Sequence, residues 1–323
     1  MAMSTPQEMG ETSKATDSKP THQRNSDKIN RPQVLARSNG ADFEATLLQY
    51  SLPYDRDAVR MSDIDGLNLN ICVPANVDVS INGGLPVFVF IHGGGFHGGS
   101  SSFRSHDLAR LVRLSVAKGM PMIAVSLNYR VGAPGFMHSE EMKQAGYLPN
   151  NGFRDQRTAL LWLQKYIHGF GGNPNNVTLT GESAGAVSTA VHLHSKQPLF
   201  KRAMLMSGST LLMGPAPLQF GEASYQKALG ALNLESLTPK ERLETLVGMD
   251  AYHLRDTLGE SGVVQQVSRP LVDGDLCPTS VDFNAVLEGS LELAGKQWCE
   301  SLLLGDCAFD VGCSMLTHSW QIN

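Results

Sequence analysis

The chain has 323 residues, of which 41% are hydrophobic and 18% are charged, and its formal net charge is −5. This is ordinary globular composition, sufficient for one large domain or two ordinary ones. The acidic balance and the lack of a basic cluster argue against a nucleic-acid-binding protein, and no apolar stretch reaches the length of a membrane span.

Residues 1–40 are rich in Ser, Thr, Lys, Asp, Asn and Pro and contain few large apolar side chains. Such a segment cannot bury enough surface to offset its ordering entropy, so we predict a disordered tail. It has no apolar core of a signal peptide, and we therefore expect a cytoplasmic protein. Because no pair has C-x-x-C spacing, we expect five reduced thiols, namely Cys72, Cys277, Cys299, Cys307 and Cys313.

Apolar patterning predicts a sheet from residue 62 onwards. Residues 67–71 alternate between Leu or Ile and Asn, which is typical of a half-buried strand. Five nearly continuous apolar runs follow, as expected for strands buried inside a parallel sheet. These runs are residues 85–91, 120–127, 177–179, 203–206 and 302–304.

Helical patterns lie between the predicted strands. Residues 155–170 have apolar side chains on one face of a helix, and 171–174 supply glycines and a proline that end it. Residues 184–194 are compatible with a second helix. Residues 210–270 contain short helical patterns, which we interpret as a helical insertion over one end of the sheet. The alternation predicts an α/β protein with a doubly wound, mostly parallel sheet.

A serine between two glycines follows the run 177–179 directly. Residues 181–185 read GESAG, the pattern of a nucleophile elbow, in which a sharp strand-to-helix turn exposes one serine hydroxyl. The turn brings the strand and helix backbones close together, so small residues are needed two positions before and after Ser183.

Consecutive glycines follow the strand predicted at 85–91. Residues 92–96 read HGGGF, and such a turn lets backbone N–H groups point at one spot, as an oxyanion hole requires. The strand that ends at residue 127 runs into another turn-rich segment, residues 128–136. Two glycine-rich turns and the serine elbow therefore follow three predicted strands.

These motifs resemble the type-B carboxylesterase/lipase family, the cholinesterase-like branch of the α/β-hydrolases. The resemblance covers about residues 60 to 315 and includes a segment at 62–70 in which Gly66 replaces the family's cysteine, so the family's first disulfide cannot form. It implies an α/β-hydrolase domain over residues 41–323. The motifs, in chain order, are HGGGF at 92–96, NYRVG at 128–132, DQ at 155–156, FGGNP at 170–174, NVT at 176–178 and GESAG at 181–185.

The resemblance implies hydrolysis of a small carboxylic ester through an acyl-enzyme on Ser183, without a cofactor. The backbone amides of Gly94, Gly95 and Ala184 would hold the oxyanion. Glu182 and Ser207 resemble the buried polar residues that support the family's site. The alternatives for these two are a capped helix start and a strand-end turn.

The acid and the base are expected after Ser183 in the chain. Asp310 falls at the acid's position after the run 302–304, and Asp306 is the nearby alternative. Only His318 follows Asp310, whereas the family's histidine comes much later on a further loop. We therefore expect a fold without its C-terminal part, an uncovered sheet edge, and an enzyme impaired by lack of its base.

No pair of histidines has convincing metal-ligand spacing, so no metal site is expected. The rival hypothesis is a non-catalytic α/β-hydrolase-fold protein that binds other proteins. Retention of Ser183, Gly94, Gly95 and Asp310 together argues against it, because a binding protein does not need them. The sequence does not indicate the physiological ester or the oligomeric state.

Overall fold

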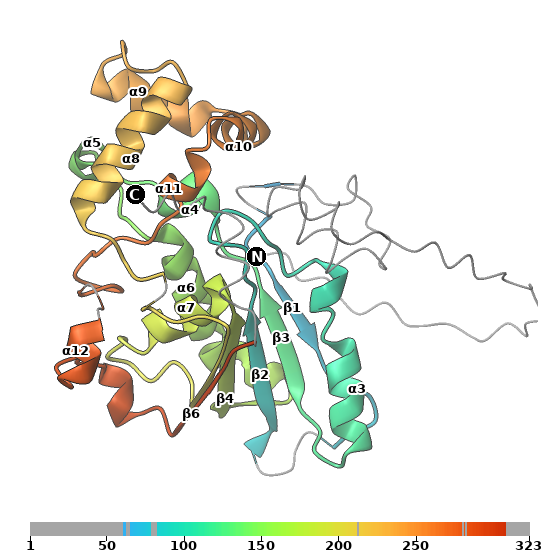
Figure 1. Cartoon of the computed structure of the whole chain (residues 1–323). Helices are drawn as coiled ribbons and strands as arrows, with labels where there is room; N and C mark the ends of the chain where they lie inside the picture. The colour runs from blue at the N-terminus through green and yellow to red at the C-terminus, as the bar shows by residue number, and fades with distance from the viewer. Residues whose placement is uncertain are drawn as a thin grey trace, which may run out of the picture. The chain divides into compact units, whose positions relative to one another are not determined.

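The computed structural model describes residues 61–62, 65–78, 83–211, 213–279, 281 and 283–307. Within these residues, six strands form one sheet in the order β1-β3-β2-β4-β5-β6 (Figure 1). Strand β1 is antiparallel to β3, and the other neighbours are parallel. The strands are β1 Leu69–Cys72, β2 Leu85–Ile91, β3 Ile123–Leu127, β4 Gly172–Glu182, β5 Arg202–Met206 and β6 Ser301–Gly305.

All six predicted strands are confirmed. Strand β3 is buried throughout and β2 nearly so, as the continuous apolar runs predicted for the middle of a parallel sheet. Strand β4 begins five residues before its apolar run, because Gly172 already pairs with Leu85 across an irregularity in the register. The mostly parallel, doubly wound sheet is therefore also confirmed.

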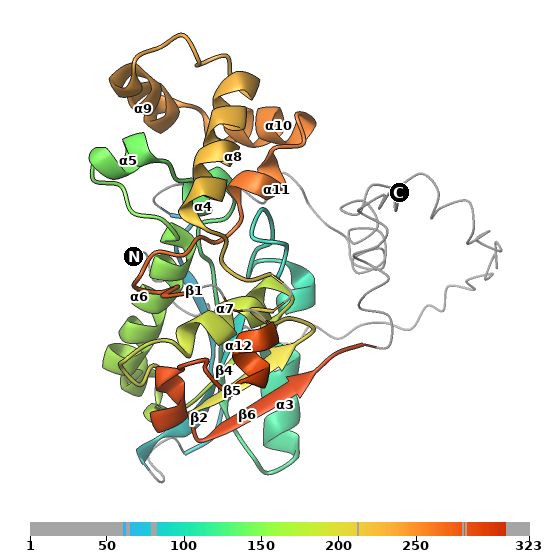
Figure 2. The ribbon, with the colours of Figure 1, turned by 60° about the vertical axis from the view of Figure 1, so that its left-hand side comes forward.

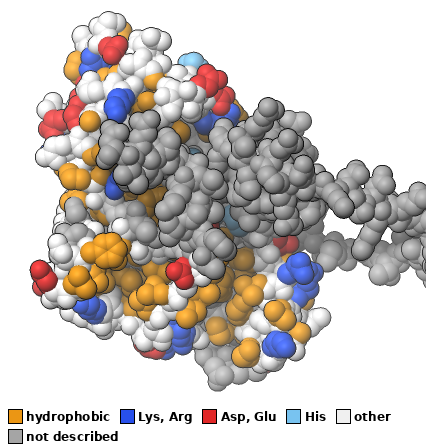
Figure 3. Space-filling view, in the orientation of Figure 1, with side chains coloured by type: hydrophobic (Ala, Val, Ile, Leu, Met, Phe, Trp, Pro, Cys, Tyr) orange, Lys and Arg blue, Asp and Glu red, His pale blue; other side chains and the backbone are white. Residues whose placement is uncertain are grey.

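Strand β6 is the uncovered edge that we expected of the described sheet, although its apolar run alone predicts a buried strand. It is the edge strand of the described sheet, and Leu302, Leu303 and Leu304 are 51%, 58% and 63% exposed. Figure 3 shows hydrophobic side chains gathered over the part of this face where Figure 1 places β6 and α12 (Phe283–Leu287). An apolar run alone does not distinguish a central strand from an edge strand.

Helices cover both faces of the sheet. Helix α3 (Ala109–Ala117) packs on one face beside β3, and α6 (Asn151–Tyr166) and α7 (Ala184–His192) pack on the other (Figures 1 and 2). The strand order reverses direction after β3, so right-handed crossovers place these connections on opposite faces. All nine residues of α7 are buried.

Helix α6 confirms the predicted helix at 155–170 with three differences. It begins at Asn151, so the DQ pair at 155–156 lies inside it and not before it. Its predicted last turn is the 3-10 helix η4 (Ile167–Phe170), which ends at Gly171 with φ 82° as expected. Tyr166, which the helical spacing places on the apolar face, is 42% exposed, because the buried stripe passes through Leu163 and Ile167.

The helical insertion is confirmed, and it has a core of its own. Tyr225, Leu229 and Leu258 are buried in this second core together with Ala133 of the short helix α4 (Gly132–Phe136), which follows β3. The insertion therefore lies beyond the end of β3, as Figures 1 and 2 show. Its helices are α8 Leu218–Ala231, α9 Pro239–Gly248, α10 Ala251–Glu260 and α11 Val264–Val267.

Short helices complete the described chain. They are η3 Arg104–His106, α5 Glu140–Gln144 and η5 Ala294–Gln297. No helix of the described ranges is both long and apolar enough to cross a membrane.

The carboxyl ends of the parallel strands meet at one edge of the sheet. Ile91 pairs with Leu127 and with Gly181, and Glu182 pairs with Met206, which in turn pairs with Gly305. Loops leaving this carboxyl edge therefore start side by side. In α/β proteins this edge is where ligands bind.

Candidate active site

Ser183 lies in a strained turn between β4 and α7. Its φ and ψ are 52° and −119°, a conformation that residues with a Cβ rarely adopt. The glycines on either side are sterically required: a Cβ on Gly181 would overlap the carbonyl of Gly185, and a Cβ on Gly185 would overlap the end of β2. The strand-turn-helix geometry expected of the GESAG segment is present.

The glycine loop after β2 packs against this turn. A Cβ on Gly93 would lie 2.6 Å from Glu182 Oε2 and 3.2 Å from Ser183 Cβ. The backbone then takes positive φ at three successive residues, 108° at Gly94, 61° at Gly95 and 64° at Phe96. Only the third has a side chain, and that ring is fully buried against Phe136 and Phe153 with centroids 5.0 and 5.5 Å away.

Three backbone N–H groups near Ser183 have no acceptor. Within the part of the chain that the structure describes, the amides of Gly94 and Gly95 donate to no other group. The amide of Ala184 begins α7, where a helix provides no internal acceptor, and it also has no acceptor among the described residues. Groups of this kind are available to bind an anionic oxygen.

The side chains of Glu182 and Ser207 are less buried than the sequence predicted. They were expected to be buried, but Glu182 is exposed and Ser207 is only half-buried. Both lie at the carboxyl ends of their strands. Ser207, with φ 53°, donates its N–H to the Gly305 carbonyl at 2.7 Å and so continues the pairing of β5 with β6. This is the strand-end turn considered as its alternative.

The acid and base candidates are not all described. Asp310 and His318 lie outside the described residues, so their roles stay predictions. Asp306 follows β6 at the carboxyl edge and is exposed. Among the described side chains, none forms a hydrogen bond with the Ser183 hydroxyl.

Two buried histidines occur near the elbow, and both are held neutral. Burial lowers the pKa of His92 to about 4, and burial together with the charge of Arg157 lowers that of His192 to about 3. His92 Nδ1 lies 2.8 Å from the Gly93 carbonyl, and His192 Nε2 lies 3.0 Å from Gln156 Oε1. In the described ranges, no group of three or more His, Cys, Asp or Glu side chains could hold a metal ion.

The NYR segment after β3 was noted in the sequence without a role. In the structure, Tyr129 donates its hydroxyl to the His92 carbonyl at 3.0 Å, and Asn128 Oδ1 accepts the Ser101 N–H at 2.8 Å. Arg130 forms a two-point ion pair with Asp155, with both N–O distances 2.8 Å. The pairing of β3 with β2 brings these residues to the glycine loop. Apolar patterning does not show which strands are neighbours.

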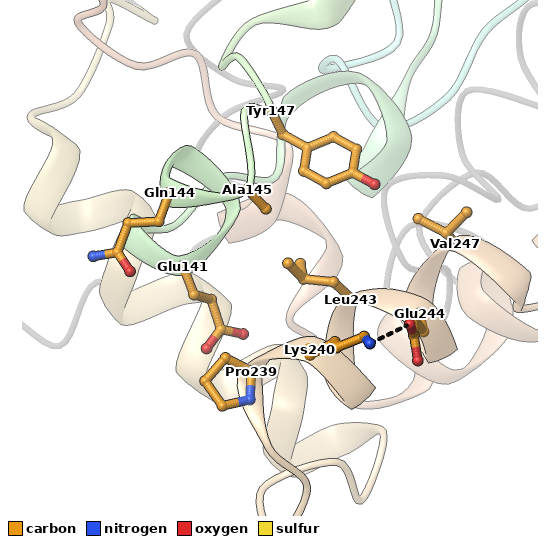
Figure 4. A pocket seen from close by; sticks show the side chains of 9 residues that line it. All are labelled: Glu141, Gln144, Ala145, Tyr147, Pro239, Lys240, Leu243, Glu244 and Val247. Atoms are coloured by element: carbon orange, nitrogen blue, oxygen red, sulfur yellow. Dashed lines mark ion pairs between the residues drawn. The ribbon is translucent and has the colours of Figure 1, made fainter.

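A surface cavity of about 460 Å³ lies elsewhere, between α5 and α9 (Figure 4). Apolar side chains such as Leu243 and Val247 line it, and Lys240 and Glu244 form an ion pair of 3.8 Å on its wall. The carboxylate of Glu141, on α5, also lines the cavity and already accepts hydrogen bonds from Tyr225 and Arg242 of the insertion. None of the residues around Ser183 lines this cavity.

The sheet order, the helices on both faces and the serine turn between β4 and α7 define an α/β-hydrolase fold. The model of the carboxylesterase family matches residues 6–286. The chain therefore belongs to the carboxylesterase family, and the family predicted from the motifs is confirmed.

The relatives include lipases, cholinesterases and esterases. Lipase 2 of Diutina rugosa is 36% identical over 206 residues, which is 61% of this chain and 35% of the lipase. Acetylcholinesterase of Electrophorus electricus is 46% identical over 152 residues, 46% of this chain and 22% of that protein. A solved PNB esterase matches with a TM-score of 0.65 and 28% identity, covering 84% of this chain and 54% of the esterase. The chain thus spans about a third of the lipase and about half of the solved esterase.

Proposed function

We propose that this protein hydrolyses carboxylic esters through an acyl-enzyme on Ser183. The observation that carries the proposal is the strained turn at Ser183 beside three amides, of Gly94, Gly95 and Ala184, that have no acceptor among the described residues. The serine oxygen attacks the ester carbonyl, and these amides stabilise the negative charge on the carbonyl oxygen. The carbon–oxygen bond to the alcohol then breaks, and water releases the acid from Ser183.

A base for Ser183 is the incomplete element of this mechanism. The proton of the serine hydroxyl must pass to a base and then to the leaving alcohol. No described histidine bonds the hydroxyl, so His318 is the histidine to test, with Asp310 as its partner and Asp306 as the alternative. If His318 does not supply the base, we propose that turnover is slow. The oxyanion amides and substrate binding alone accelerate such a reaction about 10³–10⁴-fold over the rate in water.

The test measures hydrolysis of a short-chain p-nitrophenyl ester by the purified chain. Ser183→Ala abolishes turnover under the proposal, and His318→Ala shows whether that histidine serves. Comparison of Asp310→Asn with Asp306→Asn assigns the acid, because only the acting carboxylate reduces kcat when neutralised. Equal turnover by the wild type and Ser183→Ala rules out the acyl-enzyme.

The alternative is a non-catalytic α/β-hydrolase-fold protein that binds other proteins. Labelling with a fluorophosphonate separates the two. A catalytic serine reacts and Ser183→Ala does not, whereas a binding protein leaves Ser183 unlabelled.

A further inference from the structure

The direction of each unpaired N–H near Ser183 is fixed by the hydrogen bonds that the carbonyl of the same peptide group accepts. In a trans peptide the C=O and N–H point in opposite directions, so a hydrogen bond that fixes the oxygen also fixes the direction of the N–H. The Gly95 amide shares its plane with the Gly94 carbonyl, which accepts from the N–H groups of His97 and Gly98 at 3.1 Å each. The Ala184 amide shares its plane with the Ser183 carbonyl, which accepts from Val187 at 3.0 Å.

The third plane is fixed by a side chain. The Gly94 amide shares its peptide with the Gly93 carbonyl, and that oxygen lies 2.8 Å from His92 Nδ1. Because a carbonyl only accepts, the ring must carry its proton on Nδ1 and donate it. Two of the planes are therefore held by nearby backbone, whereas the plane of Gly94 depends on an imidazole.

The imidazole of His92 is itself closely packed. The ring is 1% exposed and stacks on Tyr129, with centroids 4.5 Å apart and planes 17° from parallel. The Tyr129 hydroxyl donates to the His92 carbonyl at 3.0 Å. Gly99 has no side chain there, and a Cβ at that position would lie 2.5 Å from His92 Nδ1. These contacts restrict the ring to one orientation.

We propose that His92 is a positioning residue that aims the Gly94 amide at the oxyanion, and that Tyr129 holds its ring in the required plane. This inference rests on the proposed ester hydrolysis at Ser183. His92 acts through the Gly94 amide and touches no reacting atom. Its ring forms no hydrogen bond with Ser183 among the described residues.

The test compares His92→Asn with His92→Leu. The two replacements have similar size and both remove the stacked ring, but the amide of Asn keeps an N–H at the position of Nδ1. We expect kcat to be about tenfold lower in His92→Leu than in His92→Asn with the same KM, since loss of a whole oxyanion donor costs about 10²–10³. Rates are expressed per fluorophosphonate-reactive site, which removes any effect of misfolded protein.

Tyr129→Phe is the second variant, because it keeps the stacked ring and removes only the hydroxyl. Thermal unfolding tests whether this variant is folded, and we expect a smaller fall in kcat, about threefold, again without a change in KM. If the wild type is active and kcat per site is equal in His92→Asn and His92→Leu, the positioning role is overturned and the proposed function is not. If the His92 variants do not fold, an unchanged kcat in Tyr129→Phe overturns the positioning role in the same way. A wild type that neither turns over nor labels overturns the proposed function first.

Discussion

His192 makes the stability of the chain depend on pH. Its side chain is fully buried on α7, and its Nε2 lies 3.0 Å from Gln156 Oε1 on α6. The amide nitrogen of Gln156 donates to Ser188 Oγ at 3.1 Å, so its oxygen faces His192. An amide oxygen only accepts, so His192 Nε2 carries the proton of the bond between the two side chains. The other ring nitrogen, Nδ1, has no hydrogen-bond partner among the described residues. A proton added there would place a charge on a fully buried ring, at a nitrogen that no described group accepts from.

The size of the effect follows from the two pKa values of His192. Burial, reinforced by Arg157, lowers the pKa from 6.5 to about 3 in the folded chain. Between these values the unfolded state binds a proton that the folded state does not, so stability is fully present above pH 6.5 and falls as the pH is lowered. A pH of 5 lies about 1.5 units below the unfolded pKa, so the free energy of unfolding is lower there by about 2 kcal/mol.

The assay is urea unfolding at pH 8 and pH 5 of the wild type and His192→Leu. At pH 8 the variant should be less stable by about 1–3 kcal/mol, because Gln156 Oε1 loses its donor. Between pH 8 and pH 5, however, it should lose about 2 kcal/mol less than the wild type. His253→Leu is the control, since this histidine of α10 is exposed and should leave the wild-type difference unchanged. An equal loss in the wild type and His192→Leu refutes the reasoning.

Two further predictions concern a close backbone contact and an ion pair near the carboxyl edge. Gly185→Ala should destabilise the chain by about 3 kcal/mol or more in urea unfolding, because its Cβ would overlap the end of β2. Gly169→Ala, where a Cβ meets nothing within 4 Å, should change stability by less than about 1 kcal/mol, and equal effects would contradict the elbow packing. Asp155→Asn should cost about 1–3 kcal/mol, since its side chain is 8% exposed and paired with Arg130. The matched Asp256→Asn, in an exposed pair with Arg255, should cost less than about 0.5 kcal/mol. A similar loss in both variants would show that the Asp155 pair stabilises the chain no more than an exposed pair does.

The strands could be predicted because each contains an apolar run that the sheet buries. The start of α6 could not, because Asn150 precedes it in a left-handed conformation with φ 58° that is stabilised from far along the chain. Its side chain exchanges two hydrogen bonds with the backbone of Leu271, 121 residues away. No local pattern around residue 150 shows such a contact. The apolar run of β6 does not show its exposure either, and only the expectation of an uncovered sheet edge points to it.

The candidate site was predictable where its chemistry depends on local backbone. Ser183 and the glycines at 94 and 95 are recognisable because positive φ and close packing require particular residue types. The exposure of Glu182 and Ser207 was not, because it depends on what covers the carboxyl edge. The acid at Asp310, the base at His318, the tail at 1–40 and the cytoplasmic location stay predictions.

The three amides also explain why part of the site escapes sequence reasoning. The planes of Gly95 and Ala184 are fixed by amides three or four residues from the carbonyls they bind, so a glycine turn and a helix start are enough to produce them. The plane of Gly94 depends on His92, whose ring is held by Tyr129, 37 residues away. That contact exists only because β3 pairs with β2 and ends level with it. A change that shifts β3 should therefore disturb one amide and leave the other two in place.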